Sequence, residues 1–135
     1  MGKVVLHCGQ RFKSYSYVGM INKIFKTDYK MYIRSSFKLD DYGKRGYIAW
    51  IVYLNNEWHS NWKNNIVEDK IIEECNDIEK FLKDAKKYPK RLVFSRCPKT
   101  SGECVFIGTA YLKSVDFVHM TKEYSLVRKE EVLVI

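Results

Sequence analysis

The sequence contains no long hydrophobic run. Across its 135 residues, no segment approaches the roughly 20 apolar residues that a membrane-spanning helix requires. The apolar run near the start, Val4 to Leu6, is too short for a secretory signal peptide. We therefore expect a cytoplasmic protein that has no membrane partner.

Motifs of catalytic machinery are missing as well. The three histidines are isolated from one another, and no nucleophile elbow or histidine-pair metalloprotease helix occurs. The seven glycines are widely scattered and form no phosphate-binding loop. The pattern favours a binding protein over an enzyme, and we expect no catalytic residues and no cofactor. A metal-dependent nuclease would have to take its Mg²⁺ ligands from a charged segment that we expect to be solvated, namely Glu68, Asp69, Glu73 and Glu74.

Cysteine occurs at four positions, without the spacing of a zinc knuckle. In a reducing compartment Cys8, Cys75, Cys97 and Cys104 are not expected to form disulfides. Cys97 and Cys104 are separated by six residues across a predicted turn, and His7 adjoins Cys8. Zinc knuckles place paired ligands two to four residues apart. We interpret the cysteines as free thiols in strands, and a zinc site drawn from two strands stays an open alternative.

Acidic residues are outnumbered, and they are unevenly placed. The net charge is +8, yet residues 48–80 hold seven acidic against three basic side chains, so the basic excess lies in 1–47 and 81–135. This distribution predicts a polarised surface that attracts anions on one side. Ten tyrosines and three tryptophans exceed the needs of a small core, so some rings are expected on a contact surface. We favour a polyanion partner; the alternative is a lysine excess that serves solubility or reflects an AT-rich genome.

Two apolar segments separated by a polar turn predict a β-hairpin. Residues 91–97 and 104–112 carry aromatic and β-branched side chains, and the turn between them contains Gly102. Lys90, Arg96 and Lys99 cluster around its entry and its turn. In a basic, tyrosine-rich chain, such a hairpin predicts a surface that binds a nucleic acid or nucleotide through phosphate charge and ring stacking.

The remaining periodicities predict one α+β domain over residues 1–135, with strands in the majority. Strands are expected at 3–8, 29–39, 47–54 and 126–135, of which 47–54 is apolar on both faces and therefore central. A helix is expected around 17–25, capped by Ser14 or Ser16, and another from Asn76 until Pro89 stops it. Residues 55–65 are expected to be irregular, and 66–74 fit a strand or a helix. The expected fold is a small, mostly antiparallel, curved β-sheet or β-barrel with two or three helices.

Several short segments carry a resemblance to a known class of module. Residues 22–25, 29–36, 62–66, 71–74, 92–95 and 105–108 resemble small β-rich modules found beside nucleases in bacterial restriction systems. Those modules are similar to PUA-like and SET- and RING-associated folds. The resemblance implies a curved barrel that recognises nucleic acid, sometimes by holding a flipped modified base. No fused nuclease domain is present in these residues, so the module would act alone.

The resemblance implies a pocket in which aromatic faces sandwich a base while polar groups read its edge. The candidates for stacking are Tyr32, Trp50, Trp58 and Trp62. The candidates for reading the edge are Asn22, Ser35, Ser36 and Asn64. The candidates for phosphate contacts are Arg34, Arg45, Lys90, Arg91, Arg96 and Lys99.

A second function class stays open. A small, basic protein of this kind could be a phage or mobile-element product that binds and inhibits a host defence protein, or that sequesters a nucleotide signal. A protein-binding role would use an exposed aromatic patch together with the acidic segment 57–80. Its binding would depend less on salt than phosphate binding does.

Overall fold

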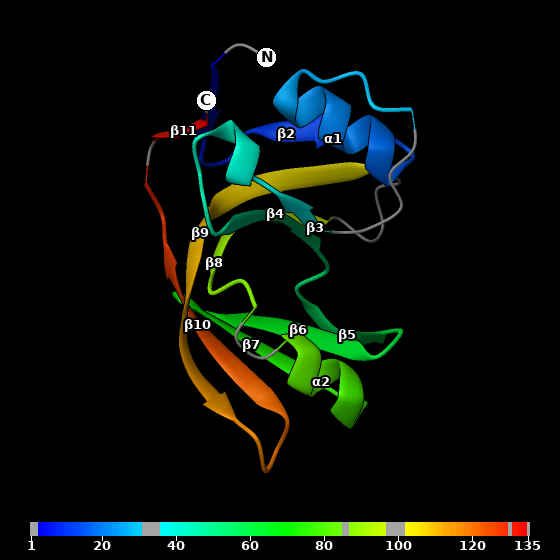
Figure 1. Cartoon of the computed structure of the whole chain (residues 1–135), viewed down its shortest axis with the longest axis vertical. Coiled ribbons are helices and arrows are strands. Elements are labelled where there is room, and N and C mark those ends of the chain that lie inside the picture. Colours follow the sequence, from blue (N-terminus) through cyan, green and yellow to red (C-terminus); the bar gives the residue numbers. More distant parts are fainter. Residues whose placement is uncertain (1–2, 31–35, 85–86, 97–101, 130, 135) are drawn as a thin grey trace.

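The computed structural model describes residues 3–30, 36–84, 87–96, 102–129 and 131–134. Two helices and a large curved array of strands make up this part of the chain (Figure 1). The strands are β1 (Val4–His7), β2 (Arg11–Lys13), β3 (Ser36–Lys38), β4 (Tyr47–Val52), β5 (Asn55–His59), β6 (Trp62–Val67), β7 (Lys70–Cys75), β8 (Lys90–Arg96), β9 (Glu103–Asp116), β10 (Thr121–Val127) and β11 (Glu131–Val134). The helices are α1 (Tyr17–Phe25) and α2 (Ile78–Asp84), with a 3₁₀ turn η1 (Asp40–Tyr42). Neither α1 nor α2 has the length and apolar character to cross a membrane.

The main sheet is open and almost wholly antiparallel. Its order is β3-β4-β8-β9-β10-β7-β6-β5, with β2 paired to β9, and β1 pairs with β11 in a separate two-stranded sheet. Only β4 and β8 run parallel. β9 has 14 residues and, with β10, connects the two halves of the curved sheet (Figure 1). The expectation of a mostly antiparallel, curved sheet is therefore confirmed.

The barrel alternative is wrong for the described residues. A barrel requires its first and last strands to pair, whereas β3 and β5 end the strand order and each has one neighbour. Side chains from both end strands, Lys38 of β3 and His59 of β5, instead line a cleft. The sheet thus curves without closing.

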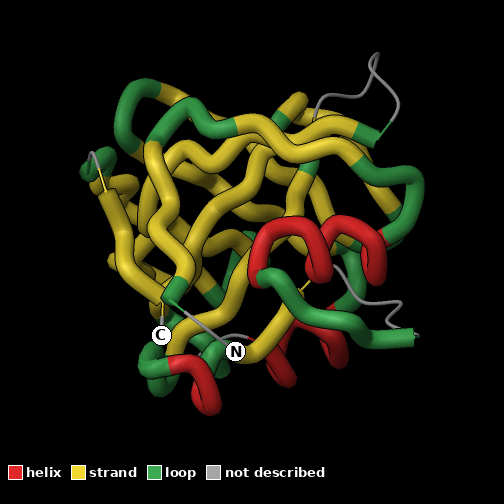
Figure 2. The backbone as a smooth tube through the Cα atoms, turned by 90° about the horizontal axis from the view of Figure 1, so that it is seen from above, coloured by secondary structure: helices red, strands yellow, loops and turns green. Residues whose placement is uncertain are grey.

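The central strands bury both of their faces. On one face Ala49, Ile51, Leu92 and Phe94 join the first apolar core, which α1 covers (Figure 2). The other face contributes Ile48, Trp50, Val52 and Val93 to a second apolar cluster. Because side chains alternate along a strand, a continuous apolar run over 47–52 supplies both cores. The prediction of a central strand here is confirmed.

Both helices begin where the sequence indicates. The Ser16 side chain accepts a hydrogen bond from the Gly19 backbone N–H at 3.0 Å, so Ser16 rather than Ser14 caps α1. Met20, Ile21, Ile24 and Phe25 form its buried face. At the second helix, Asp77 Oδ1 accepts from the backbone N–H groups of Glu79 and Lys80. The helical periodicity of α1 is confirmed. For α2 the helix is confirmed, but Lys87 and Tyr88 before Pro89 are not helical, and Ile78 and Leu82 are exposed while Phe81 is buried.

The predictions for residues 55–65 and 126–135 were wrong, whereas the predicted hairpin of residues 91–97 and 104–112 was right. Residues 55–65, expected to be irregular, form most of the hairpin of β5 and β6, with the positive φ values of Asn56 and Ser60 supplying its bends. Residues 126–135, expected as one strand, contain the end of β10 and a separate β11. β8 and β9 do pair as predicted, with Arg96 opposite Cys104. Residues 70–75 are a strand, β2 was not anticipated, and residues 31–35 of the expected strand 29–39 lie outside the described residues.

Candidate functional site

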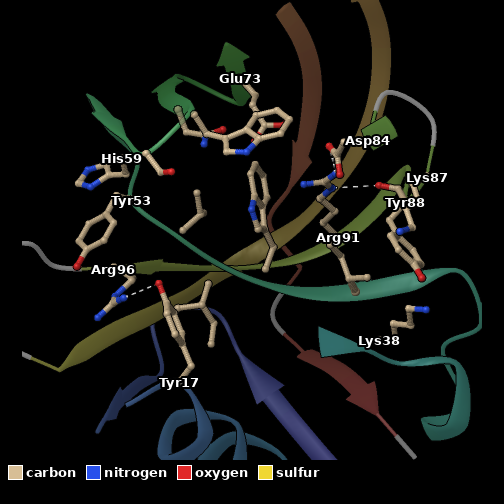
Figure 3. Close-up of a pocket in the computed structure, with 17 residues that line it drawn as sticks. Tyr17, Lys38, Tyr53, His59, Glu73, Asp84, Lys87, Tyr88, Arg91 and Arg96 are labelled. Atoms are coloured by element: carbon tan, nitrogen blue, oxygen red, sulfur yellow. Dashed lines mark hydrogen bonds and ion pairs between the residues drawn. The ribbon is translucent and has the colours of Figure 1, made fainter. Parts of the chain in front are cut away.

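A cleft of about 740 Å³ lies between the two halves of the curved sheet. β4 and β8 supply one wall, and β5, β6, β7 and α2 supply residues of the other (Figure 3). Its lining combines aromatic rings with charged and amide side chains from distant parts of the chain. The lining residues are Tyr17, Lys38, Ile48, Trp50, Ile51, Val52, Tyr53, His59, Ser60, Trp62, Asn64, Glu73, Asp84, Lys87, Tyr88, Arg91 and Arg96.

Tryptophan rings come from both walls of the cleft. Trp50 shares a face of β4 with Ile48 and Val52, and its ring centroid lies 5.6 Å from that of Tyr124. Trp62 begins β6, where Lys122 Nζ lies 5.1 Å from the centroid of its ring. Trp50 is buried, and Trp62 is half-buried. Trp50 belongs to the second apolar cluster, and the half-buried Trp62 ring is the one of the two with exposed surface on which a nucleobase can stack.

A buried network of ion pairs joins three strands and α2 at one end of the cleft. Lys122 Nζ lies 2.9 Å from Glu73 Oε1 and also contacts the carboxylate of Asp84. Asp84 Oδ2 in turn accepts from Arg91 Nη2 at 3.2 Å, and Arg91 Nε donates to the Tyr88 carbonyl at 3.0 Å. The side chains of Lys122, Glu73 and Arg91 are 0%, 4% and 4% exposed, so their charges are stabilised by one another rather than by solvent.

The network keeps its charges at neutral pH. Burial acts to raise the pKa of Asp84, but Arg91 and Lys122 together hold it below its usual value. Burial acts to lower the pKa of Lys122, yet Glu73 and the other neighbouring groups raise it overall. Burial also raises the pKa of Tyr124 to about 12, so this phenol stays neutral. The network thus pairs two acidic with two basic side chains, and Lys38 and Lys87 also line this end of the cleft (Figure 3).

One polar atom of the cleft has no partner among the described residues. Asn64 is 5% exposed, and its Oδ1 atom is buried without a hydrogen bond. Glu73 Oε1 also lacks an aligned hydrogen bond, but at 2.9 Å from Lys122 Nζ it is compensated by the ion pair. A buried acceptor without a partner costs about 1–3 kcal/mol. Asn64 Oδ1 is thus poised to accept a hydrogen bond from a bound molecule.

Four planar groups lie at the opposite end of the cleft, namely the Arg96 guanidinium, the Tyr17 and Tyr53 rings and the His59 imidazole. The Arg96 guanidinium carbon lies 4.9 Å from the Tyr17 ring centroid and 4.7 Å from that of Tyr53. Tyr53 stacks on His59 with centroids 4.2 Å apart and an interplanar angle of 13°. Arg96 Nη1 donates to the Tyr17 hydroxyl at 2.9 Å. Figure 3 shows this group well separated from Asp84, Lys87 and Tyr88.

The cleft brings together five of the sequence candidates. Trp50, Trp62, Asn64, Arg91 and Arg96 all line it, although they come from strands far apart in the sequence. Arg91 is 3% exposed and its charge is engaged by Asp84, so it does not have the free surface expected of a phosphate contact.

Other candidates lie away from the cleft or outside the described residues. Trp58 is 44% exposed and Arg45 is exposed, and neither lines the cleft. Lys90 is exposed at the start of β8, with Nζ 5.3 Å from the Tyr47 ring centroid. The Asn22 side chain holds the turn after α1 through Thr27 and Tyr29. Ser36 belongs to β3, and the candidates outside the described residues are Tyr32, Arg34, Ser35 and Lys99.

The members of the buried ion-pair network were not recognised as such from the sequence. Glu73, expected in a solvated segment, is 3% exposed and lies between Ile71 and Cys75 on the buried face of β7, and Lys122 precedes Tyr124 on the buried face of β10. A charged residue at an inward position of an alternating strand was the available signal, because such charges require partners. Tyr17, Tyr53 and His59 carry no such signal, since their meeting depends on the tertiary fold. Lys38, Asp84, Lys87, Tyr88 and Ser60 were missed as well.

The described residues give no support to either metal site considered above. They contain no group of three His, Cys, Asp or Glu side chains arranged to hold a metal ion. Cys104 is buried with its sulfur 3.4 Å from that of Met20, and Cys8 donates to the Lys129 carbonyl. Cys97 lies outside the described residues. Along β7, Glu73 is buried whereas Glu74 pairs with Lys63 near the surface, so these carboxylates do not converge.

Comparison with known proteins identifies a fold relative. No protein-family model and no curated protein matches the sequence. The solved structures include a match to the 5-hydroxymethylcytosine-specific restriction enzyme AbaSI, with a TM-score of 0.61 and 23% sequence identity. The match covers 80% of this chain and 36% of the enzyme chain. The chain therefore shares the fold of roughly a third of that enzyme.

Proposed function

We propose that this protein is a DNA-recognition module of a restriction or related defence system, and that it takes one modified base into the cleft. The fold likeness to part of a restriction enzyme supports this proposal, as does the net charge of +8. We also propose that the fold is of the PUA-like, SET- and RING-associated type. The single observation that carries the proposed function is the cleft itself, which combines stacking rings with a buried, unpartnered acceptor.

The cleft chemistry suits a base that has left the duplex. A flipped base needs aromatic surfaces for its faces and polar atoms for its edge, and Trp62 and Asn64 are the cleft residues proposed to supply them. Asn64 Oδ1 accepts hydrogen bonds, which matches the exocyclic amino group of cytosine or the hydroxyl of a hydroxymethyl substituent. A flipped base would therefore satisfy an atom that has no partner among the described residues.

Fluorescence anisotropy with three otherwise identical duplexes tests the proposal. The duplexes carry cytosine, 5-methylcytosine or 5-hydroxymethylcytosine at one position. We expect the duplexes with a modified cytosine to bind more tightly than the duplex with unmodified cytosine. Trp62→Ala should remove about 1–3 kcal/mol of binding free energy, the usual value of one stacked base, and Asn64→Ala should reduce the preference among the duplexes.

Trp58→Ala is the matched control. Trp58 lies in the same hairpin as Trp62 but is 44% exposed and does not line the cleft. Its removal should leave the affinity unchanged. Equal binding of the three duplexes, with Trp62→Ala behaving like Trp58→Ala, would reject the base-binding role. The alternative of a protein-binding inhibitor predicts that no oligonucleotide binds.

A further inference from the structure

Strand β8 presents two arginines to the same cleft, and each has two aromatic rings close to its guanidinium. Arg91 Cζ lies 4.6 Å from the Trp50 ring centroid and 5.0 Å from that of Tyr124. Its charge is neutralised, because Asp84 binds it at 3.2 Å and the Tyr88 carbonyl accepts from its Nε. Arg91 is therefore a structural arginine whose hydrogen-bonding edge is already occupied by protein atoms.

Arg96 also has two rings close by but different hydrogen-bond partners. Its guanidinium carbon lies 4.9 Å from the Tyr17 ring centroid and 4.7 Å from that of Tyr53. Within the described parts of the chain no carboxylate forms an ion pair with it, and the Tyr17 hydroxyl is its hydrogen-bond partner there. A guanidinium has five N–H donors. Most donors of this half-buried cation therefore stay available to the cleft.

The surrounding stack holds this guanidinium in a defined plane. Tyr17 is the first residue of α1, Tyr53 follows β4, His59 ends β5, and Arg96 ends β8. His59 stacks on Tyr53 and is itself oriented by a 3.2 Å contact between its Nε2 and Asn55 Oδ1. Tyr17 and Tyr53 thus contact the arginine directly from two other parts of the chain, and His59 supports Tyr53. Such fixation reduces the entropy lost when a ligand binds.

We propose that Arg96 binds a backbone phosphate of the nucleic acid, adjacent to the base that enters the cleft. This inference rests on the function proposed above. Arg96 lines the cleft with N–H donors that no described carboxylate engages, and two of these N–H groups can match two oxygens of one phosphate. Tyr17, Tyr53 and His59 are positioning residues. The cleft thus has a phosphate end at Arg96 and, at Arg91, an end where buried charges pair with one another.

The salt dependence of binding tests this assignment. Affinity for the modified duplex is measured by anisotropy at several salt concentrations for the wild type, Arg96→Gln and Arg96→Lys. Loss of one phosphate contact should reduce the magnitude of the slope of log affinity against log salt by about one. At fixed salt, Arg96→Gln should bind about tenfold more weakly, as expected for one charge-assisted hydrogen-bonded contact. Arg96→Lys should keep the slope but lose affinity, because an ammonium cannot stack or bind two oxygens in plane.

Arg128→Gln is the matched control for the lost charge. Arg128 is exposed, pairs with Asp69 at 3.2 Å and does not line the cleft. The Arg128→Gln protein should have the same affinity, and the same slope of log affinity against log salt, as the wild type. An Arg96→Gln protein that is folded by circular dichroism yet keeps the wild-type slope would overturn the phosphate assignment while leaving base binding intact.

A free nucleotide is the other possible source of a phosphate. The 5′-monophosphate of the modified deoxycytidine serves as the competing probe. We expect it to displace the duplex only at far higher concentration than an unlabelled duplex does. Competition at equal concentration would overturn the backbone phosphate as the source. If the wild type binds no oligonucleotide, the proposed function and this inference both fail.

Discussion

The two ends of the cleft use the same side chain in opposite ways. At one end Arg91 has two rings close to its guanidinium, is buried and has its charge balanced by Asp84. At the other end Arg96 also has two rings close to its guanidinium, but within the described residues it has no acidic partner and is half-buried. Contact with aromatic rings is therefore not what distinguishes a structural arginine from a ligand-binding one. The presence or absence of a carboxylate is the difference.

The Arg91 end also explains why carboxylates can line a cleft that we propose for DNA. Glu73 and Asp84 would repel phosphates if their charges were free. Lys122 pairs with both of them, and Arg91 pairs with Asp84. Glu73 and Asp84 therefore do not present free negative charges to the cleft. Among the described residues, the lysine and arginine side chains that line the cleft outside this network are Lys38, Lys87 and Arg96.

The largest effect on stability is expected when the ion-pair network at the Arg91 end of the cleft loses one of its members. Asp84→Asn keeps the size of the side chain but leaves the buried charge of Arg91 without its counterion. Removing one partner of a buried pair costs on the order of 3 kcal/mol of unfolding free energy, measured here by urea denaturation. Asp116→Asn is the control, since Asp116 forms an exposed pair with His119 and should change stability by less than about 1 kcal/mol. Equal effects of the two substitutions would show that the network does not hold this end together.

Acid should weaken the Arg91 end of the cleft in a way that depends on Asp84. Its pKa is held below the usual value, so the folded carboxylate binds a proton less readily than the unfolded one does. As the pH falls below about 4, protons stabilise the unfolded chain more than the folded chain, and the contribution of Asp84 is lost. Melting temperatures of the wild type and Asp84→Asn, measured from about pH 6 to about pH 3, should therefore begin to converge once the pH falls below about 4. A constant gap across this range would contradict the lowered pKa.

The same contrast indicates which parts of the molecule can be predicted from sequence. Segments with one clear period were predictable, including α1 with its Ser16 cap and the doubly apolar β4. The β5 and β6 hairpin was not, because β5 is largely exposed and polar, and its bends use Asn56 and Ser60 at positive φ instead of glycine. Local patterns indicate burial, and these strands bury few side chains.

In the candidate site, too, some features could be predicted from sequence and others could not. Trp62, Asn64, Arg91 and Arg96 could be selected by residue type, since rings, amides and arginines are the groups that nucleic acids bind. Which arginine is neutralised could not be, because Arg91 meets Asp84 through the packing of α2 against the sheet. The Arg96 stack depends on contacts such as that with Tyr17, 79 residues away in the sequence. Pairings of this range are properties of the fold rather than of any local pattern.

The smallest effect on stability is expected from a substitution at the Arg96 end of the cleft. Arg96→Gln removes a charge that no described carboxylate balances, so no counterion is left buried and unpaired. The loss is limited to ring contacts and the hydrogen bond to Tyr17, and it should lower the unfolding free energy by about 1 kcal/mol or less. Urea denaturation beside Asp84→Asn gives the comparison directly. A loss as large as that of Asp84→Asn would mean that Arg96 also serves the fold, and the two ends of the cleft would then not differ in role.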